Sequence, residues 1–376
     1  MRDLDIVVFG ATGFVGRLTA QHLARHAPPG TTIALGGRSL PRLEAVRAEL
    51  GVDWPLVVAD TGDPAALRAM AERATVVATT VGPYARYGLP LVQACTLPRL
   101  PAAPGSCTPA ASIRSRRTSR CCCCTAKAAA SSRTPRCCSR PPAAASAVGR
   151  STRCATRSTV SKADTSLKRV AADPYALSPS RADEPDLGGE GDFVLPRRDD
   201  LVGRWVAPFV MAPFNTRIVR RSNALQHWAY GRRFRYTEVM GVGPMPVAPV
   251  LAAAVSAGVI GLGLGMAFPP ARLVLDRVLP KPGEGPSEQA RENGHFRTQT
   301  HARTADGRHL VATVAATGDP GYAATAVMLG QSALSLALDE LPGNGGVRTP
   351  ATAMGTALVE RLRAQGFELT VTEASR

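Results

Sequence analysis

The run Asp5-Ile6-Val7-Val8-Phe9-Gly10-Ala11-Thr12-Gly13-Phe14-Val15-Gly16 decides the fold of the first part of the chain. Its first five residues form a short, β-branched apolar run of the kind that makes a buried parallel strand. The glycines that follow allow a tight turn, and a helix that begins at Gly13 directs its free N–H groups and the positive end of its dipole toward bound phosphates. The spacing is G-x-x-G-x-x-G rather than G-x-G-x-x-G, so the motif depends on its context.

A second strand, Thr32–Leu35, supplies that context, because it ends in Gly36-Gly37-Arg38-Ser39. In NAD-binding folds an acidic residue near the end of this strand holds the ribose hydroxyls, whereas an arginine accommodates the 2′-phosphate of NADP. Arg38 therefore predicts NADP(H) as the cofactor. The alternative interpretation is a surface arginine at the start of the helix 40–50.

Two more strands complete the pattern. Pro55–Asp60 ends in an acid that we expect beside the adenine, and Thr75–Thr80 runs into Val81-Gly82-Pro83-Tyr84. Strands that alternate with helical stretches predict an α/β fold, a doubly wound Rossmann-type parallel sheet that binds its ligand at the carboxyl ends of the strands. The predicted cofactor-binding residues are Gly10, Thr12, Gly13, Phe14, Val15, Gly16, Arg38, Ser39, Asp60, Gly82, Pro83 and Tyr84.

Residues 96–160 differ sharply in composition from the rest of the chain. They contain no aromatic and no acidic residue, twelve of the Arg and Lys residues, and eight of the nine cysteines. Without these twelve positive charges the formal net charge falls from +16 to +4, so the basic balance says little about acidic partners. A segment this poor in large apolar groups cannot offset its ordering entropy, and by composition it is expected to be disordered.

Three interpretations of this segment compete. A metal or disulfide site needs spaced thiols, which Cys121-Cys122-Cys123-Cys124 and Cys137-Cys138 do not offer, so no metal site is expected. Nucleic-acid binding lacks aromatic residues for base stacking, so none is expected either. The third interpretation is a frameshift, because a GC-rich gene read out of frame yields mostly Ala, Arg, Pro, Ser, Thr and Cys. We favour the third.

Several motifs carry a resemblance to a known family. The turns Gly10–Gly16 and Gly36–Ser39, and above all Val81-Gly82-Pro83-Tyr84-Ala85-Arg86-Tyr87-Gly88-Leu89-Pro90, resemble the saccharopine dehydrogenase-like oxidoreductases. Within them the chain is most similar to the trans-acting enoyl reductases of mycobacterial lipid synthesis. The resemblance resumes at 173–179 and covers most of the remaining chain, including 209–225, 228–231, 318–322 and 349–355.

The resemblance implies an NADPH-dependent enoyl reductase that acts in trans on acyl intermediates held by a polyketide synthase or acyl carrier, in phthiocerol- and phenolphthiocerol-type lipid biosynthesis. It also implies that the C-terminal helices pack against the nucleotide domain. Between Cys95 and Asp173 the family pattern is absent, and the chain is some tens of residues short of the family's usual length. The alternative function is a non-catalytic protein that binds nucleotide or lipid at a membrane or synthase. No catalytic residue can be named.

The second half offers two further features. Six arginines lie among apolar residues and could meet a phosphopantetheine or a carboxylate, or could simply form a solvated face. They are Arg217, Arg220, Arg221, Arg232, Arg233 and Arg235. Asn215 and Tyr230 are either pocket residues or partners in buried hydrogen bonds.

The stretch Gly241–Pro270 carries no charge. About 20 apolar residues suffice for a membrane span, but this stretch is rich in Ala and Gly and has prolines near both ends. We expect a helix within 247–270 that docks on a bilayer or lines an apolar cleft, with Arg272, Arg277 and Lys281 suited to an anionic surface.

The length of 376 residues suits two domains. We assign 1–95, joined by helices of 320–376, to an NADP-binding Rossmann domain, 96–165 to the anomalous segment, and 166–319 to a substrate- or lipid-facing α+β domain. The start of the chain has no signal-peptide layout, so the protein is expected in the cytoplasm, with the inner face of the plasma membrane as the site of any membrane contact.

Overall fold

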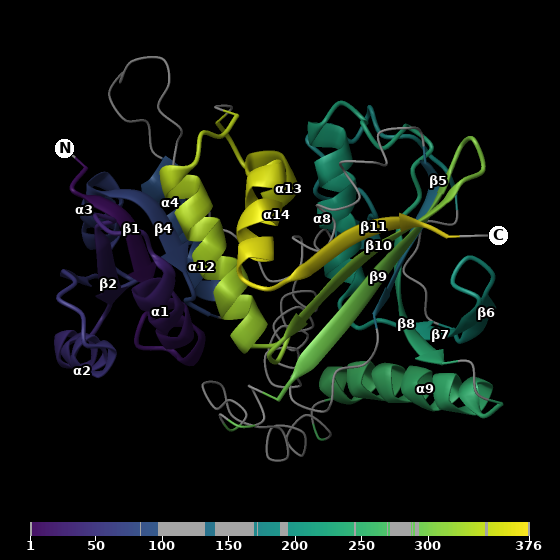
Figure 1. Ribbon diagram of the computed structural model, residues 1–376, viewed down its shortest axis with the longest axis horizontal. Coiled ribbons are helices and arrows are strands. Elements are labelled where there is room, and N and C mark those ends of the chain that lie inside the picture. Colours follow the sequence, from purple (N-terminus) through teal and green to yellow (C-terminus); the bar gives the residue numbers. More distant parts are fainter. Residues whose placement is uncertain are drawn as a thin grey trace. The chain divides into compact units, whose positions relative to one another are not determined.

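The structure is a computed structural model that describes residues 2–82, 84–96, 132–139, 169–170, 172–188, 195–243, 246–268, 270, 287, 289, 293–342 and 345–374. The chain divides into two compact units (Figure 1). The first comprises Met1–Arg116, Gly283–Ser287 and Gly321–Gln365, and the second Arg117–Pro282, Glu288–Pro320 and Gly366–Arg376.

The first unit contains a parallel sheet of four strands in the order β3-β2-β1-β4. Its strands are β1 (Leu4–Phe9), β2 (Ile33–Gly37), β3 (Leu56–Val58) and β4 (Ala74–Thr79). The central strand β1 pairs Val8 with Leu35 on one side and with Ala78 on the other. The predicted Rossmann-type parallel sheet is confirmed.

Helices cover both faces of this sheet. They are α1 (Phe14–His26), α2 (Leu40–Leu50), α3 (Pro64–Arg73), α4 (Tyr84–Thr96) and α12 (Ala323–Leu338). The helix α14 (Gly355–Ala364) contacts α12, and the short helix α13 (Pro350–Ala353) contacts α14. Buried side chains of β1 alternate between the faces, with Ile6 and Val8 in the core beneath α1, α2 and α12, and Val7 and Phe9 in the core beneath α3 and α4. This alternation explains why the strand reads as a continuous apolar run.

The C-terminal helix α12 contacts α1, β1 and β4, as the family resemblance implies. Its residues Ala333 and Leu334 are buried in the same core cluster as Ala20 and Leu23 of α1. A bidentate ion pair joins the end of α12 to α14, because Arg361 donates Nε to Asp339 Oδ2 at 2.8 Å and Nη2 to Oδ1 at 2.5 Å. This guanidinium lowers the pKa of Asp339.

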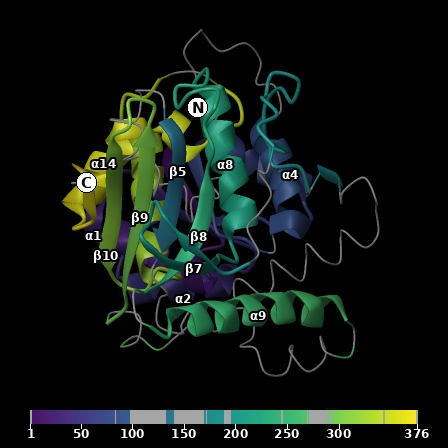
Figure 2. The ribbon, with the colours of Figure 1, turned by 90° about the vertical axis from the view of Figure 1, so that its right-hand side faces the viewer.

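The second unit contains a seven-stranded mixed sheet in the order β11-β10-β9-β5-β8-β7-β6 (Figure 2). Its strands are β5 (Ser132–Ser139), β6 (Arg197–Asp199), β7 (Arg204–Pro208), β8 (Thr237–Gly243), β9 (His295–Thr304), β10 (His309–Thr317) and β11 (Glu368–Glu373). All neighbours are antiparallel except β5 and β8. Helix α8 (Ala212–Leu225) packs on β8, and α9 (Ala248–Ala267) packs on β7 and β8.

The strand β5 is an exception to the prediction that the anomalous segment has no structure. Its backbone pairs with β9 from Ser132 to Ser139 and with β8 from Arg136 to Ser139. Backbone ladders use N–H and C=O groups that every residue except proline carries in full, so such pairing does not depend on an apolar composition. The other residues of the segment between Leu97 and Lys168, with six of its cysteines, lie outside the described residues.

Candidate functional site

The turn after β1 is built around two glycines. Gly10 has a φ of +91°, a backbone conformation that residues with a Cβ rarely adopt. Its N–H donates to the Gly36 carbonyl at 2.8 Å, and the Ala11 N–H donates to the same oxygen at 3.1 Å. The Gly13 N–H in turn donates to the Gly10 carbonyl at 2.9 Å. The turn is therefore tied to the end of β2 and closed on itself.

Gly16 allows the helix α1 to sit directly on this turn. A Cβ at Gly16 would lie 2.1 Å from the Gly10 carbonyl oxygen, which no side chain permits. Gly13 is the exposed N-cap of α1, and no side chain caps it. The first N–H groups of a helix have no carbonyl from a preceding turn, so this end of α1 is suited to receive an anion.

Thr80 braces the turn from β4, a role that the sequence analysis missed. Its N–H donates to the Phe9 carbonyl at 2.9 Å, and its Oγ1 donates to the Gly10 carbonyl at 3.1 Å. A Cβ on Gly10 would lie 2.8 Å from the same Oγ1. The only sequence signal was a hydroxyl residue at the carboxyl end of the fourth strand.

Thr12, Phe14 and Val15 complete the start of α1 in different ways. Val15 is buried, whereas Thr12 and Phe14 are half-buried. The Phe14 ring meets the Tyr322 ring edge-on, with centroids 5.0 Å apart and an interplanar angle of 90°. Phe14 therefore joins the turn to the first residues of the helix α12.

Arg38, Ser39 and Asp60 lie on the turns after β2 and β3, at the same carboxyl edge of the sheet. Arg38 is exposed, directly after the last residue of β2. Ser39 is the N-cap residue of α2, but its side chain makes no capping hydrogen bond. Asp60 is exposed, and its Oδ1 accepts the Gly62 N–H at 2.7 Å. Arg38 thus lies at the carboxyl end of the second strand, exposed at the edge of the sheet where ligands bind in such folds.

The turn after β4 holds the remaining predicted residues. Gly82 is exposed, and Pro83 lies outside the described residues. Tyr84, the first residue of α4, is half-buried and packs across its own helix, because a Cβ at Gly88 would lie 2.5 Å from the Tyr84 ring. Gly88 thus allows the ring to lie flat along α4.

These turns fit a bound dinucleotide. The glycine turn leaves the amino end of α1 open for a pyrophosphate, and an exposed guanidinium and an exposed carboxylate follow the two neighbouring strands. All of them lie at the carboxyl edge, next to the position where the strand order changes direction between β1 and β4. In open α/β sheets this is where ligands bind.

The buried titratable groups of this unit serve structure rather than chemistry. Burial raises the pKa of the Cys95 thiol to about 11, so it stays a protonated, weak nucleophile near neutral pH. Burial, helped by His26 and Arg25, lowers the pKa of His22 to about 4. Across the described residues of both units, no group of three or more His, Cys, Asp and Glu side chains has a geometry that could hold a metal ion.

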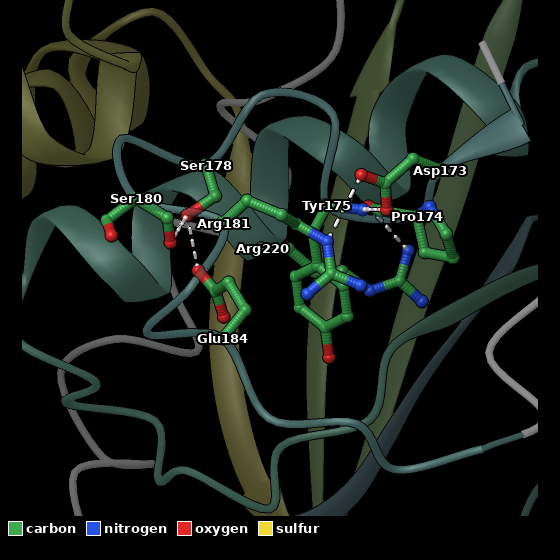
Figure 3. Close-up of polar contacts among 8 residues, drawn as sticks. All are labelled: Asp173, Pro174, Tyr175, Ser178, Ser180, Arg181, Glu184 and Arg220. Atoms are coloured by element: carbon green, nitrogen blue, oxygen red, sulfur yellow. Dashed lines mark hydrogen bonds and ion pairs between the residues drawn. The ribbon is translucent and has the colours of Figure 1, made fainter. Parts of the chain in front are cut away.

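The arginines of the second unit hold a loop in place. Arg220 is buried and donates Nη2 to the Tyr236 carbonyl at 3.1 Å and Nη1 to the Pro174 carbonyl at 3.4 Å. The ring of Tyr175 lies between two guanidinium groups, those of Arg220 at 5.5 Å and Arg181 at 5.1 Å from its centroid (Figure 3). Asp173 accepts from Arg181 Nε at 3.2 Å.

Other arginines of the predicted set make similar contacts. Arg221 donates to the Leu177 carbonyl at 2.5 Å, Arg232 donates to the Asp183 carbonyl at 3.3 Å, and Arg235 donates to the carbonyls of Leu187 and Gly188. The interpretation of a solvated face is wrong for Arg217 and Arg220, which are buried. Backbone carbonyls of residues 174–188 thus accept hydrogen bonds from Arg220, Arg221, Arg232 and Arg235.

Asn215 and Tyr230 are partners in internal hydrogen bonds. Asn215 donates to Glu238 Oε2 at 2.7 Å, and Tyr236 donates to Glu238 Oε1 at 3.1 Å, all three residues being buried. The hydroxyl of Tyr230 accepts from Gln226 Nε2 at 2.8 Å. This geometry favours the second of the two roles that the sequence left open for them.

Comparison with known proteins places the chain in a family. No protein-family model matches it. A trans-acting enoyl reductase of Mycobacterium tuberculosis strain H37Rv is 44% identical over 416 aligned positions, which cover 100% of this chain and 99% of that protein. A trans-acting enoyl reductase of Mycobacterium ulcerans strain Agy99 is 43% identical over 414 positions, covering 99% and 98%. Saccharopine dehydrogenase (L-Glu forming) from Saccharomyces cerevisiae superposes with a TM-score of 0.49 at 12% identity, covering 98% of this chain and 99% of that one.

The alignment also shows a difference in length. It runs over 416 positions, and this chain has 376 residues, so at least 40 positions of that relative have no counterpart here. The two chains nevertheless match from end to end at an identity that unrelated proteins do not reach. The chain belongs to the trans-acting enoyl reductase family.

Proposed function

We propose that the protein is an NADPH-dependent enoyl reductase that acts in trans on acyl intermediates bound to a polyketide synthase. The observation that carries the proposal is the glycine turn Gly10–Gly16 at the amino end of α1, in a chain 44% identical over its whole length to proteins named trans-acting enoyl reductase. The remaining steps concern the cofactor, the substrate and the partner.

Arg38 supports NADPH rather than NADH. A guanidinium directly after β2 can donate two parallel hydrogen bonds to a 2′-phosphate, whereas an NAD-specific site has an acid there. Arg38 is exposed at this position, and Ser39 follows it with a hydroxyl that no capping bond occupies. Asp60, on the next turn, would lie on the adenine side. The N–H groups of the first turn of α1 would hold the pyrophosphate.

The chemistry divides between cofactor and protein. When bound, the nicotinamide supplies the hydride that reduces the enoyl double bond at the β-carbon of the thioester. The protein's part is to orient the dinucleotide and to keep the reacting groups in line. Gly10, Gly16 and Thr80 do this by fixing the turn. The proton that reaches the α-carbon has no assigned donor.

The proposed substrate is an enoyl thioester of a long acyl chain, of the type found in phthiocerol and phenolphthiocerol lipids. The basis for this step is the family, whose members are named trans-acting enoyl reductases.

We also propose that the protein is cytoplasmic and that its helix α9 rests on the lipid surface at the inner face of the plasma membrane. The helix packs on β7 and β8 through small residues, Ala248, Ala252 and Ser256, which are buried. Its large apolar side chains point away from that contact and are exposed, namely Val250, Leu251, Ile260 and Leu264, with Phe268 at its end. Within the part of the chain that the structure describes, no helix is long and apolar enough to cross a membrane.

A bilayer suits this helix better than a protein partner does, because the helix has no charge or polar rim that a specific interface would read. Vesicles of anionic phospholipid should sediment with the full chain, and the double variant Val250→Glu/Leu264→Glu should stay in the supernatant. A matched control, Glu72→Gln on α3, should sediment like the natural chain. Equal sedimentation of the double variant would refute the lipid contact. The basic residues Arg272, Arg277 and Lys281 lie outside the described residues.

The second candidate function is a binding protein without turnover. It is favoured by one observation, the at least 40 aligned positions that this chain lacks. The two functions separate in one assay, in which the full chain is mixed with NADPH and an enoyl thioester of a small acyl-carrier mimic. An enzyme oxidises NADPH only when the thioester is present. Binding of NADPH without oxidation identifies the binding protein.

For the anomalous segment we propose an out-of-frame reading of the gene between the codons of Cys95 and Asp173. The basis is the composition of residues 96–160, which have neither acidic nor aromatic residues, between flanks that keep the family pattern. A fresh DNA read in all three frames tests this. A frame whose translation aligns with the relatives over the positions that this chain lacks supports the proposal, and a confirmed sequence with no such frame overturns it.

A further inference from the structure

The helices α1 and α12 run parallel and in register. Near their starts, Phe14 meets Tyr322, and farther along, His22 meets Gly330 and Gln331. The two contacts are eight residues apart on each helix, counting from Phe14 to His22 and from Tyr322 to Gly330. Parallel helices with matched contacts begin at the same end, so α12 begins beside the glycine turn, at the carboxyl edge of the sheet.

The contact of His22 with Gly330 and Gln331 is close and buried. A Cβ at Gly330 would lie 2.7 Å from His22 Cδ2, so only glycine lets the helices approach this closely. The His22 Nε2 and the Gln331 Nε2 are 2.9 Å apart. Because burial lowers the pKa of His22 to about 4, the ring is neutral near pH 7 and its Nε2 accepts from the amide. The pair anchors α1 against α12 at this level.

The contact of Phe14 with Tyr322 lies directly after the glycine turn. Phe14 is the first residue of α1, and Gly13 before it offers no side chain to cap the helix. Tyr322 is 8% exposed and is the residue from which α12 begins. Its ring holds the Phe14 ring edge-on, an arrangement in which the ring edge of one aromatic meets the face of the other.

We propose that Tyr322 is a positioning residue of the dinucleotide site, which acts through Phe14 to hold the first turn of α1 against the pyrophosphate. The inference rests on the proposed function, because it needs a dinucleotide at this turn. Tyr322 comes from the far end of the chain, more than three hundred residues beyond the glycine motif, and no glycine pattern includes it.

The role predicts which part of the cofactor is affected. NADPH and NADH share the pyrophosphate and differ at the 2′-phosphate, so loss of the ring contact should weaken both by the same factor. An aromatic pair contributes about 0.5–1.5 kcal/mol beyond its buried area, which corresponds to roughly a three- to tenfold change in Kd. Tyr322→Phe keeps the ring and should bind both cofactors like the natural chain.

The chain offers a matched control in the second unit. Phe296 and Phe367 form another edge-to-face pair, with centroids 6.2 Å apart and an interplanar angle of 67°. Phe367→Leu removes an aromatic pair of the same kind, in a different unit from the glycine turn. It should lower stability to a similar extent and leave both Kd values unchanged.

The experiment measures Kd for NADPH and NADH, and the thermal midpoint, for the full chain and for Tyr322→Leu, Tyr322→Phe and Phe367→Leu. We expect Tyr322→Leu to weaken both cofactors three- to tenfold, Tyr322→Phe to restore binding and Phe367→Leu to leave it unchanged. Natural affinity in Tyr322→Leu overturns the inference. If that variant does not fold, Phe14→Leu answers the same question from the other ring. If the natural chain binds neither cofactor, the proposed function fails instead.

Discussion

The two sheets of this protein are built on different principles. In the first unit the parallel strands β1 and β2 are buried on both faces, and β1 pairs on both sides with apolar strands, β2 and β4. In the second unit the long antiparallel strand β9 alternates over its first six residues between buried and more exposed positions. The parallel sheet places turns that bind a ligand at one edge, whereas the mixed sheet presents a surface. We therefore expect cofactor binding to be sensitive to small changes at the turns of the first unit and insensitive to similar changes in the second unit.

The largest expected effect breaks the glycine turn. Gly16→Ala puts a Cβ 2.1 Å from the Gly10 carbonyl oxygen, so the helix must move off the turn. Overpacking of this kind costs about 1–3 kcal/mol, and we expect NADPH affinity to fall by up to roughly a hundredfold. Isothermal titration measures it. The control is Gly258→Ala in the second unit, where nothing lies within 4 Å of the new Cβ. NADPH binding by Gly16→Ala at natural affinity would show that the turn is not the site.

The next effect tests the arginine network of the second unit. Arg220→Met removes the donors to the carbonyls of Tyr236 and Pro174 and leaves Tyr175 without one of its two guanidinium neighbours. Leaving buried carbonyls unsatisfied costs about 1–3 kcal/mol, which urea denaturation measures. NADPH affinity should not change. Arg233→Met, at an exposed position, should be nearly neutral. A stable Arg220→Met with lost enoyl reduction would instead identify a substrate contact.

The third effect compares buried histidines. Burial lowers the pKa of His22 in the first unit and of His301 in the second to about 4, from an ordinary value of 6.5. Between these values the unfolded chain binds more protons than the folded chain, so stability is full above pH 6.5 and falls as the pH drops toward 4. Each such histidine lowers the free energy of unfolding by about 2 kcal/mol between pH 7 and pH 5.

Histidine variants show how much of this pH-dependent loss of stability comes from each unit. His22→Gln and His301→Gln should each reduce the difference in unfolding free energy between pH 7 and pH 5. His295→Gln, at an exposed position, should leave it unchanged. The His301 ring also meets His309, with Nδ1 and Nε2 3.2 Å apart, so a second group titrates beside it. A pH profile that none of the buried variants alters would contradict the linkage.

The first sheet could be predicted closely from the sequence, because each of its strands is a short apolar run that ends in a glycine or an acid. The four strands predicted within residues 5–9, 32–35, 55–60 and 75–80 are observed as β1, β2, β3 and β4. What could not be predicted depends on contacts between distant residues. Thr80 and Tyr322 act on the glycine turn from separate parts of the chain, and a threonine or tyrosine in the sequence carries no signal of such a contact.

The second unit was less predictable for the same reason. Arginines in a mixed stretch suggested a ligand or a solvated face, and only the positions of carbonyls in 174–188 show that they hold a loop. The strand β5 has no apolar pattern of a strand, and its pairing with β8 and β9 uses backbone groups that do not depend on such a pattern. Side-chain patterns report burial, and this loop and this strand depend on main-chain atoms instead.

The proposed cofactor site consists of the turns of the first unit, which would bind NADPH with Arg38 on its 2′-phosphate. The most direct measurement is a titration of the full chain and of Arg38→Asp with NADPH and with NADH. A charge-assisted pair contributes about 1.5–3 kcal/mol, so we predict that the substitution weakens NADPH by roughly ten- to a hundredfold and changes NADH little. An equal loss for both cofactors, or a natural chain that binds NADH as tightly as NADPH, would contradict the claim.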